Sequence, residues 1–255
     1  MNQEIPVAVL GARGRMGAEA VRAVEAADGL SLVAALGRDD SLDILVSAGV
    51  RVMVDLTVPE ATYRNVAFAV DHGIHAVVGT TGWTNERLAD LGELLEGNPA
   101  TGVLIAPNFA LGSVLATAFA ASAARYFESV EIVELHHPDK VDAPSGTAAR
   151  TAQLVSRARS AAGISRSPDA TNSDPGGARG ADVDGVRVHS VRLRGLTAHQ
   201  EVLLGSPGEQ LTIRHDSFDR ASFMPGVLLG IRSVAAHPGL TVGLDGYLDL
   251  QSPDS

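Results

Sequence analysis

Residues 7–17 have the sequence VAVLGARGRMG, in which a short apolar run leads directly into three regularly spaced glycines. The run is typical of a buried strand, and the residues after Gly17 predict a helix that ends near Ala27. Between a strand and a helix, Gly11, Gly14 and Gly17 let the backbone approach a pyrophosphate, while the first amides of the helix point at its oxygens. The spacing differs from the commoner GxGxxG, so an ordinary tight turn is the alternative.

The alternation of strand and helix continues over the first hundred or so residues. Further strands are expected at 32–36, 51–56, 75–78 and 102–106, and helices at 61–71 and 85–96. Strands that alternate with helices form parallel sheets with right-handed crossovers. This part of the chain is therefore expected to be a Rossmann-like, doubly wound parallel sheet of the α/β class.

The pattern changes beyond residue 106. A helix is expected at 111–126, strands at 129–136, 186–194, 200–204 and 210–214, a helix at 217–236 and a strand-like segment at 240–250. Consecutive strands without intervening helices predict a mixed sheet, and hence a second domain of the α+β type. Residues 163–185 are rich in Gly, Ser, Asp and Pro and are interpreted as a mobile surface loop, with a lid or contact arm as the alternative.

The composition excludes several classes of protein. The formal net charge is −10, which disfavours binding to nucleic acid. Because cysteine is absent, there are no disulfides and no thiolate metal ligands. Residues 97–124 carry no charge, but Pro107, Asn108 and many small residues favour a buried strand and a packed helix over a membrane span. The first residues are unlike a signal peptide, so a cytoplasmic enzyme is expected.

The end of the second predicted strand bears on which dinucleotide would bind. An acidic residue at this place binds the ribose hydroxyls of NAD, but here Gly37 is followed by Arg38. An arginine attracts a 2′-phosphate, so the sequence favours NADPH. Asp39 or Asp40 could reach the ribose while Arg38 stays in solvent, and NADH therefore remains possible.

Two more segments follow predicted strands at the edge where open α/β sheets bind ligands. They are residues 55–59, DLTVP, and residues 79–82, GTTG. Their small side chains and free backbone groups suit contact with a nicotinamide. Ordinary strand-to-helix turns are the alternative for both.

Residues 134–148, ELHHPDKVDAPSGTA, form the most informative segment after the glycine loop. Ser145 is a good N-cap, and the amides of Gly146 and Thr147 would then form an anion site at a helix start. Lys140 is the single lysine of a chain with 19 arginines. Its ammonium lies close enough in sequence to help hold a carboxylate.

Two adjacent histidines lie in the same segment. In an extended strand, the rings of His136 and His137 would face opposite sides, which disfavours a two-histidine metal site, and no metal is expected. A histidine beside an anion site suits proton transfer near neutral pH. Strand-end histidines satisfied by backbone groups are the alternative.

The glycine loop, GTTG at 79–82, APNF at 106–109 and above all the segment at 134–148 resemble the dihydrodipicolinate reductase family. The resemblance runs in order over nearly the whole chain. It implies a dinucleotide-binding domain at 1–106 and 215–255, and a substrate-binding and tetramerisation domain at 107–214. It also implies a homotetramer and a step in the biosynthesis of diaminopimelate and lysine. The family often has an acidic residue where this chain has Gly37.

The resemblance assigns roles to individual residues. His136 would be the proton donor, Lys140 a second acid or a cation that activates the substrate, and His137 a substrate contact. Ser145, Gly146 and Thr147 would bind a carboxylate of a small dicarboxylate substrate. The cofactor would be lined by Gly11, Ala12, Arg13, Gly14, Arg15, Met16, Gly79, Thr80, Thr81, Ala106, Pro107, Asn108 and Phe109. The geometry of the glycine loop adds Gly17 to this set, and the attraction of an arginine for a 2′-phosphate adds Arg38.

The implied reaction is hydride transfer from NADPH to a cyclic unsaturated imine, with loss of water and protonation of the product enamine. Two other functions remain open at this stage. One is a reductase of similar architecture that acts on another amino-acid-derived acid, such as an aspartate or homoserine dehydrogenase. The other is a module that binds a nucleotide without turnover.

Overall fold

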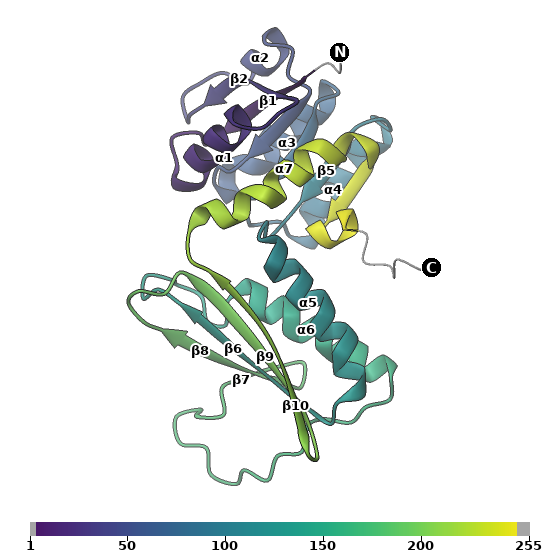
Figure 1. The fold of residues 1–255 in the computed structure, drawn as a ribbon. Coiled ribbons are helices and arrows are strands. Elements are labelled where there is room, and N and C mark those ends of the chain that lie inside the picture. The colour runs from purple at the N-terminus through teal and green to yellow at the C-terminus, as the bar shows by residue number, and fades with distance from the viewer. Residues whose placement is uncertain (1–3, 249–255) are drawn as a thin grey trace. The chain divides into compact units, whose positions relative to one another are not determined.

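The computed structural model describes residues 4–248 (Figure 1). Within this range the chain forms two compact units, one made of residues 4–111 and 220–248 and the other of residues 112–219. The expected divisions at 106/107 and 214/215 fall a few residues before the observed ones. Each unit has its own sheet and its own buried apolar cluster.

The first unit contains a six-stranded sheet in the order β11-β5-β4-β3-β1-β2, and every strand pair in it is parallel. Its strands are β1 (Ile5–Leu10), β2 (Leu30–Leu36), β3 (Val52–Asp55), β4 (His75–Val78), β5 (Gly102–Ile105) and β11 (Gly239–Val242). From β1 the order proceeds one way to β2 and the other way to β3, so the carboxyl ends of β1 and β3 border the crevice where such sheets bind ligands. The predicted doubly wound fold is confirmed.

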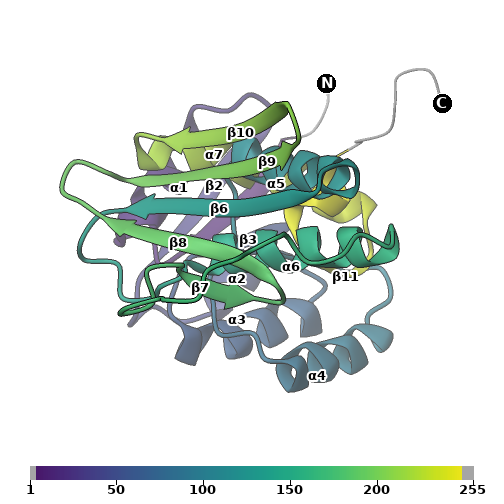
Figure 2. The same cartoon turned by 90° about the horizontal axis from the view of Figure 1, so that it is seen from below.

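Helices cover both faces of this sheet (Figures 1 and 2). They are α1 (Arg15–Glu25), the short α2 (Asp43–Ser47), α3 (Pro59–Asp71), α4 (Asn85–Glu96) and α7 (Met224–Ser233). Ala76 and Val78 belong to the cluster packed against α3 and α4, while Val77, between them in β4, faces Gly230 of α7. Alternate residues of one strand therefore meet helices on opposite faces, which explains why these strands are apolar throughout.

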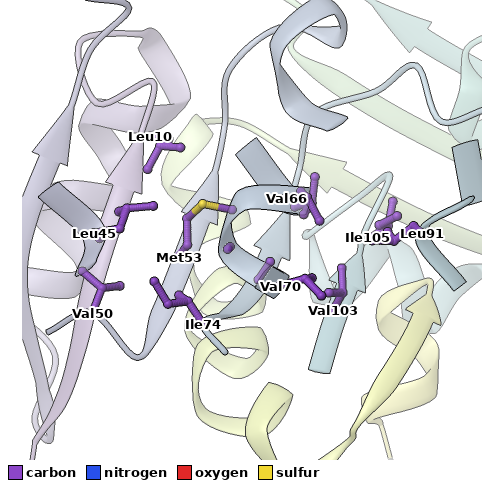
Figure 3. Packing of buried hydrophobic residues seen from close by; sticks show 14 of the residues in the cluster. Leu10, Leu45, Val50, Met53, Val66, Val70, Ile74, Leu91, Val103 and Ile105 are labelled. Carbon is purple, nitrogen blue, oxygen red and sulfur yellow. The ribbon is translucent and has the colours of Figure 1, made fainter. Parts of the chain in front are cut away.

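Figure 3 shows how aliphatic side chains from several elements fill the space on the α3 and α4 face. Met53 of β3 lies between Leu45 of α2 and Val70 of α3, and is fully buried. Pro59 begins α3, where its fixed φ suits the first helical position. Burial of this cluster fixes the carboxyl ends of the strands in one place.

The C-terminal part differs from the sequence-based expectation in two ways. The helix predicted at 217–236 starts later, because Ser217 still belongs to a strand, and it consists of α7 between 3-10 turns at Arg220–Phe223 and Val234–Ala236. The strand predicted at 240–250 ends at Val242, because Gly243 has φ 103° and a 3-10 turn follows at Leu244–Tyr247. Residues 249 and 250 lie outside the described range.

The second unit has a mixed five-stranded sheet in the order β10-β9-β6-β8-β7. The strands are β6 (Ser129–His136), β7 (Ala181–Val183), β8 (Val186–Arg192), β9 (Ala198–Ser206) and β10 (Glu209–Ser217), and only the β6–β8 pair is parallel. The helices α5 (Leu111–Ala123), which a 3-10 turn extends to Tyr126, and α6 (Gly146–Ala161) pack their alanines on one face (Figure 2). The predicted mixed sheet is thus present.

The segment at 163–185 is not irregular throughout. Its end forms β7, which the sequence did not reveal because three residues give no periodicity. Arg179 connects the segment to the sheet through an ion pair with Glu131 of β6, and it also pairs with Asp169 of the same segment. The residues between α6 and Arg179 are mostly exposed.

Among residues 4–248, none of the helices combines the length and apolar character that crossing a bilayer requires. The same residues contain no cluster of three or more histidine or carboxylate side chains that could hold a metal ion.

The buried guanidinium of Arg159 holds together several chain segments at one end of the second unit. Arg159, near the end of α6, is 5 % exposed and donates to the carbonyl oxygens of Phe127, Glu128 and Ser165 at 2.7–2.8 Å. These carbonyls belong to the turn before β6 and to the start of the 163–185 segment. The guanidinium therefore joins three parts of the chain by satisfying backbone groups that have little access to water.

Replacing Arg159 with Met is expected to lower the free energy of unfolding by about 2–4 kcal/mol, because it leaves several buried carbonyls without donors. Chemical denaturation monitored by circular dichroism measures the change. Arg157→Met, at an exposed position of the same helix, is the control and should have an effect within about 0.5 kcal/mol. Equal stability of the two variants would contradict this role for Arg159.

Candidate active site

The glycine loop has the geometry that its sequence predicts. Gly11 has φ 76°, and a Cβ at Gly17 would overlap the carbonyl of Gly11. Gly14 is the N-cap of α1, and Arg15, Met16 and Gly17 are the first residues of the helix. Their amides therefore have no acceptor carbonyl within the helix. This arrangement suits the oxygens of a pyrophosphate.

A cavity of about 610 Å³ opens beside this loop. Its walls come from the loop, the end of β2 and the start of α3, and the lining includes Gly11, Arg13, Gly14, Arg38, Thr57 and Arg64. The volume lies within the range of small-molecule sites. The wall contains three arginines and also three carboxylates, Asp39, Asp40 and Glu60, so positive charge is available at individual guanidinium groups rather than over the whole cavity.

The turn after β2 folds back on itself. Asp40 accepts the N–H of Gly37 at 2.7 Å, and the guanidinium of Arg13 lies 3.9 Å from the same carboxylate. Arg13 also fills the space where a side chain at Gly37 would lie. The carboxylate of Asp40 therefore lies at the end of β2, beside Gly37. Arg38 is exposed and lines the cavity.

A buried carboxylate organises the next strand end. Asp55 is fully buried and accepts hydrogen bonds from the N–H and hydroxyl of Thr57, the hydroxyl of Thr80 and the side-chain amide of Asn65 at 2.7–3.0 Å. Its backbone carbonyl also accepts the N–H of Gly79. Asp55 thus joins the loop after β3, helix α3 and the loop after β4.

The other residues expected at the cofactor lie close to this network. The ring of Phe109 and the side chain of Leu56 occupy the space where a Cβ of Gly79 would lie, so the segments at 79–82 and 106–109 meet. Asn108 accepts the N–H of Ala110, Ala106 donates its N–H to Val78, and Thr81 and Pro107 are exposed. The structure thus brings 79–80 and 106–109 together at the ends of β4 and β5.

Sequence reasoning missed two side chains that hold the loop after β4. Trp83 donates its indole N–H to the carbonyl of Thr80 at 3.1 Å. Arg87 donates to the carbonyls of Pro59 and Gly82 at 2.9 and 3.0 Å. Both lie downstream of the motif, and their sequence positions gave no signal of these contacts.

In the second unit, Ser145 caps α6 as predicted. Its hydroxyl accepts the N–H of Ala148 at 3.2 Å, and Ser145 itself is buried. Beyond it, Gly146 and Thr147 begin the helix. No heavy atom lies within 4 Å of the place where a Cβ of Gly146 would be, so this helix start has room for a ligand.

Lys140 and the N–H of Gly146, which are expected to hold a substrate carboxylate, both bind the carboxylate of Asp142. Asp142 accepts from Lys140 Nζ at 2.7 Å and from the N–H of Gly146 at 3.2 Å. Burial raises and the Lys140 hydrogen bond lowers the pKa of Asp142, and the net result is a lowered pKa. The structure therefore brings Lys140 and the helix start together around an anion.

His136, the expected proton donor, is held by a residue that sequence reasoning had not assigned a role. Its Nδ1 lies 2.5 Å from Oε2 of Glu134, which is fully buried. Glu134 also accepts two bonds from Arg192 at 2.8–2.9 Å and one from the N–H of Ser145 at 3.2 Å. Burial would raise the pKa of Glu134, but the hydrogen bonds from His136 and Arg192 outweigh it and lower the pKa to about 2.

Two family models together match almost the whole chain. The model described as dihydrodipicolinate reductase, N-terminus, matches residues 5–109, and the model described as dihydrodipicolinate reductase, C-terminus, matches residues 112–248. The chain belongs to the dihydrodipicolinate reductase family. It is therefore an oxidoreductase of a pyridine-nucleotide-dependent family. Because the matched family is that of the dihydrodipicolinate reductases, the chain is not an aspartate or homoserine dehydrogenase.

Curated relatives named 4-hydroxy-tetrahydrodipicolinate reductase support the assignment. The protein of Streptomyces griseus is 66 % identical over 247 residues, which cover 97 % of this chain and 99 % of the relative. The protein of Nocardia farcinica is 62 % identical over 246 residues, which cover 96 % and 99 %. The chain thus spans these relatives almost completely.

Solved structures give the same result for the fold. A dipicolinate-bound dihydrodipicolinate reductase from Paenisporosarcina sp. TG-14 superposes with a TM-score of 0.87 at 38 % identity, covering 96 % of this chain and all of that chain. A myo-inositol 2-dehydrogenase from Lactobacillus plantarum has a TM-score of 0.62 at 12 % identity, covering 96 % of this chain and 93 % of that chain, and shares the fold.

We expect Gly17→Ala to weaken NADPH binding by about tenfold or more, because displacing the Gly11 carbonyl from its turn costs about 1–3 kcal/mol. Fluorescence titration with NADPH measures the dissociation constant. The control is Gly92→Ala in α4, where an added Cβ meets no atom within 4 Å. Unchanged affinity in Gly17→Ala would remove the loop from the cofactor site.

Proposed function

We propose that the chain catalyses the reduction of 4-hydroxy-tetrahydrodipicolinate to tetrahydrodipicolinate, in the biosynthesis of diaminopimelate and lysine. The observation that carries the proposal is the anion-binding arrangement at the start of α6. Lys140 and Gly146 share a carboxylate there, and Ser145 connects the helix start to Glu134 and His136. A dicarboxylate substrate matches this set of donors, and the Paenisporosarcina relative is a dipicolinate complex.

The reaction adds a hydride and a proton to the substrate ring and releases water. The reduced nicotinamide supplies the hydride. His136 supplies the proton from Nε2, because Nδ1 is engaged by Glu134. Lys140 pairs with a substrate carboxylate or the ring nitrogen, while His137, Ser145, Gly146 and Thr147 hold the carboxylates.

In this proposal, the first unit, which was expected at 1–106 and 215–255, is the dinucleotide-binding domain, and the second unit, which was expected at 107–214, is the substrate-binding and tetramerisation domain. The pyrophosphate would lie on the amides at 15–17, the adenosine in the cavity and the nicotinamide beside 79–81 and 106–109. The cytoplasm is the proposed location, because the reaction consumes a reduced nicotinamide cofactor.

The activity is tested by following NADPH absorbance with pyruvate, aspartate semialdehyde and the upstream synthase present. We expect oxidation by the wild-type protein, a loss of about 100-fold or more in kcat for His136→Ala, and a loss in kcat/KM on the order of 2 kcal/mol or more for Lys140→Met. No oxidation by the wild-type protein would contradict the proposed function and favour a nucleotide-binding module. Near-normal kcat in both variants would contradict only the residue roles.

We propose that NADPH is the preferred cofactor and that NADH is also accepted. Arg38 lines the cavity and is exposed, so it is available to a 2′-phosphate. Asp40 already binds Gly37 and lies near Arg13, which reduces its availability to a ribose. Asp39 and Glu60 also line the cavity, so the preference rests on the position of Arg38 and not on the net charge of the wall.

NADPH should raise the melting temperature more than NADH at equal concentration, and Arg38→Ala should abolish the difference, because a charge-assisted contact contributes about 1.5–3 kcal/mol. A thermal-shift titration with both cofactors measures this. Arg22→Ala, on the exposed side of α1 and ion-paired with Glu19, is the charge-matched control. Equal shifts that do not respond to Arg38→Ala would remove Arg38 from cofactor selection.

We also propose that the protein is a homotetramer. The face of the second sheet opposite α5 and α6 contains half-buried apolar residues of β6 and β9, Val133, Leu135 and Leu203. In the described part of the second unit, both long helices lie on the other face. Such a sheet face is suited to contact with further copies of the chain.

Light scattering should give four times the 26.4 kDa chain mass. Leu203→Glu, which places a charge on the open face, should lower the mass, whereas Gln153→Glu on the exposed side of α6 should not. A monomeric wild-type protein at micromolar concentration would contradict the tetramer.

A further inference from the structure

Glu134 occupies a position that the alternation of β6 assigns to an apolar side chain. Val130 and Ile132 have the same parity along the strand, and both are buried in the cluster beneath α5 and α6. A carboxylate there loses its hydration, a cost that only several hydrogen bonds and an opposite charge can offset. Hydrophobic packing alone gives no reason for a glutamate in this position.

The strand register explains how Glu134 obtains its partners. In the parallel pairing of β6 with β8, Arg192 lies opposite His136, two residues beyond the residue opposite Glu134. Arg192 therefore reaches back and binds both oxygens of Glu134, at 2.9 Å to Oε2 and 2.8 Å to Oε1. His136 shares Oε2 with Arg192, and the N–H of Ser145 shares Oε1.

This arrangement determines which nitrogen of His136 can serve the substrate. A carboxylate only accepts, so Nδ1 carries a hydrogen and donates it to Glu134, and Nε2 remains for proton transfer. The negative charge of Glu134 stabilises the imidazolium, and the positive charge of Arg192 opposes it. The two residues therefore have opposite effects on how strongly His136 holds its proton.

Arg192 has a second contact that concerns Lys140. Its Nη2 also donates to the backbone carbonyl of Asp142 at 2.7 Å, in the loop between β6 and α6. Lys140 lies two residues earlier in that loop and is bonded to the side chain of Asp142. One ion pair thus holds the histidine, the loop of the lysine and, through Ser145, the helix start.

We propose that Glu134 and Arg192 are positioning residues that fix His136 as the Nδ1–H tautomer and set the pH range over which Nε2 delivers its proton. The proposal rests on the proposed function, because it assigns His136 the role of acid. It adds two residues to the site, and neither of them needs to touch the substrate.

The other groups of the second unit around His136 are few. β9 places neutral Ala198 opposite His136 and neutral Gln200 opposite Glu134. The loop after β6 carries His137, Asp139, Lys140 and Asp142, of which Lys140 and Asp142 pair with each other. The first turn of α6 contains no acidic residue. Glu134 therefore carries the charge that contacts the His136 ring directly, and Arg192 carries the charge that binds the same carboxylate oxygen.

The experiment measures kcat against pH for the wild-type protein and for Glu134→Gln and Arg192→Gln. The kcat of an enzyme that needs a protonated acid falls as pH rises. We expect this fall to move to lower pH by about one unit in Glu134→Gln and to higher pH in Arg192→Gln, because one variant removes the stabilising charge and the other the opposing charge. Glu131→Gln, on the opposite sheet face, is the control and should leave the midpoint of the fall unchanged.

Displacements of the same sign in both variants, or none, would overturn the proposal, since a purely structural role lowers kcat without separating the two pH profiles. Nitrogen-15 NMR of histidine in the ligand-free wild-type protein gives a readout that needs neither activity nor a variant. We expect neutral His136 to carry its hydrogen on Nδ1, and a hydrogen on Nε2 would overturn the proposal. A wild-type protein without reductase activity would contradict the proposed function instead.

A separate observation concerns Asp142. Its carboxylate is bound by Lys140 Nζ and by the N–H of Gly146, two groups to which the proposed function assigns the substrate carboxylate. Its side chain is 48 % exposed, so the contacts are open to exchange with a ligand in solution. We infer that Asp142 is an internal substitute for the substrate carboxylate, which the substrate displaces when it binds.

If a ligand carboxylate must displace Asp142 from Lys140 and Gly146, removing the charge of Asp142 should strengthen the binding of a dicarboxylate. Calorimetric titration of the full chain with dipicolinate should give a dissociation constant several-fold lower for Asp142→Asn than for the wild-type protein. Asp139→Asn changes the same charge in the same loop and should have a much smaller effect. In a Lys140→Met background, the gain from Asp142→Asn should shrink.

An unchanged or higher dissociation constant in Asp142→Asn would overturn this inference, because a residue that positions Lys140 for the substrate would weaken binding when removed. The titration needs no turnover. If the wild-type chain binds dipicolinate but does not reduce the substrate, the proposed function fails while the inference about Asp142 is still decided.

Discussion

The second unit of the molecule depends on a charge that is buried where an aliphatic side chain would fit. Glu134 is removed from water, and it is stable there because Arg192, His136 and the N–H of Ser145 satisfy both of its oxygens. Each of these donors belongs to a different part of the unit. The need to satisfy one carboxylate therefore fixes β6, β8 and the start of α6 relative to one another.

The first unit also contains a buried carboxylate, but its partners are of a different kind. Asp55 receives hydrogen bonds from a backbone amide, two hydroxyls and a side-chain amide, all of them neutral. It holds two loops at the edge of a parallel sheet but has no direct contact with a titratable group among these partners. Glu134 is instead bonded to a histidine and an arginine, so it influences where a proton resides as well as where a loop lies.

The sequence predicts the architecture well where the pattern is local. Alternating strands and helices, with glycines after the first strand, predict the parallel sheet, and Ser145 predicts the start of α6. Short elements such as α2 and β7 are too brief to show a period. The late start of the C-terminal helix reflects the pairing of Ser217 with Ala198 in β10 and β9, which local propensity does not reveal.

The site is predictable in its parts but not in its connections. The motif at 134–148 predicts His136, Lys140 and Ser145 as site residues, whereas the partner Arg192 lies 58 residues from Glu134 and is found only from the strand register. One signal for Glu134 was present, since it shares the parity of Val130 and Ile132. A charged residue in the buried register of a strand is unusual enough to indicate a functional position.

A crystal structure of the protein with dipicolinate and NADPH tests the proposed site most directly. We expect one ligand carboxylate on Lys140 and the amides of Gly146 and Thr147, in place of Asp142. We expect Nε2 of His136 to face the ligand ring while Nδ1 stays on Glu134. A ligand bound elsewhere, or a His136 ring turned so that Nδ1 faces the ligand, would contradict the proposed site.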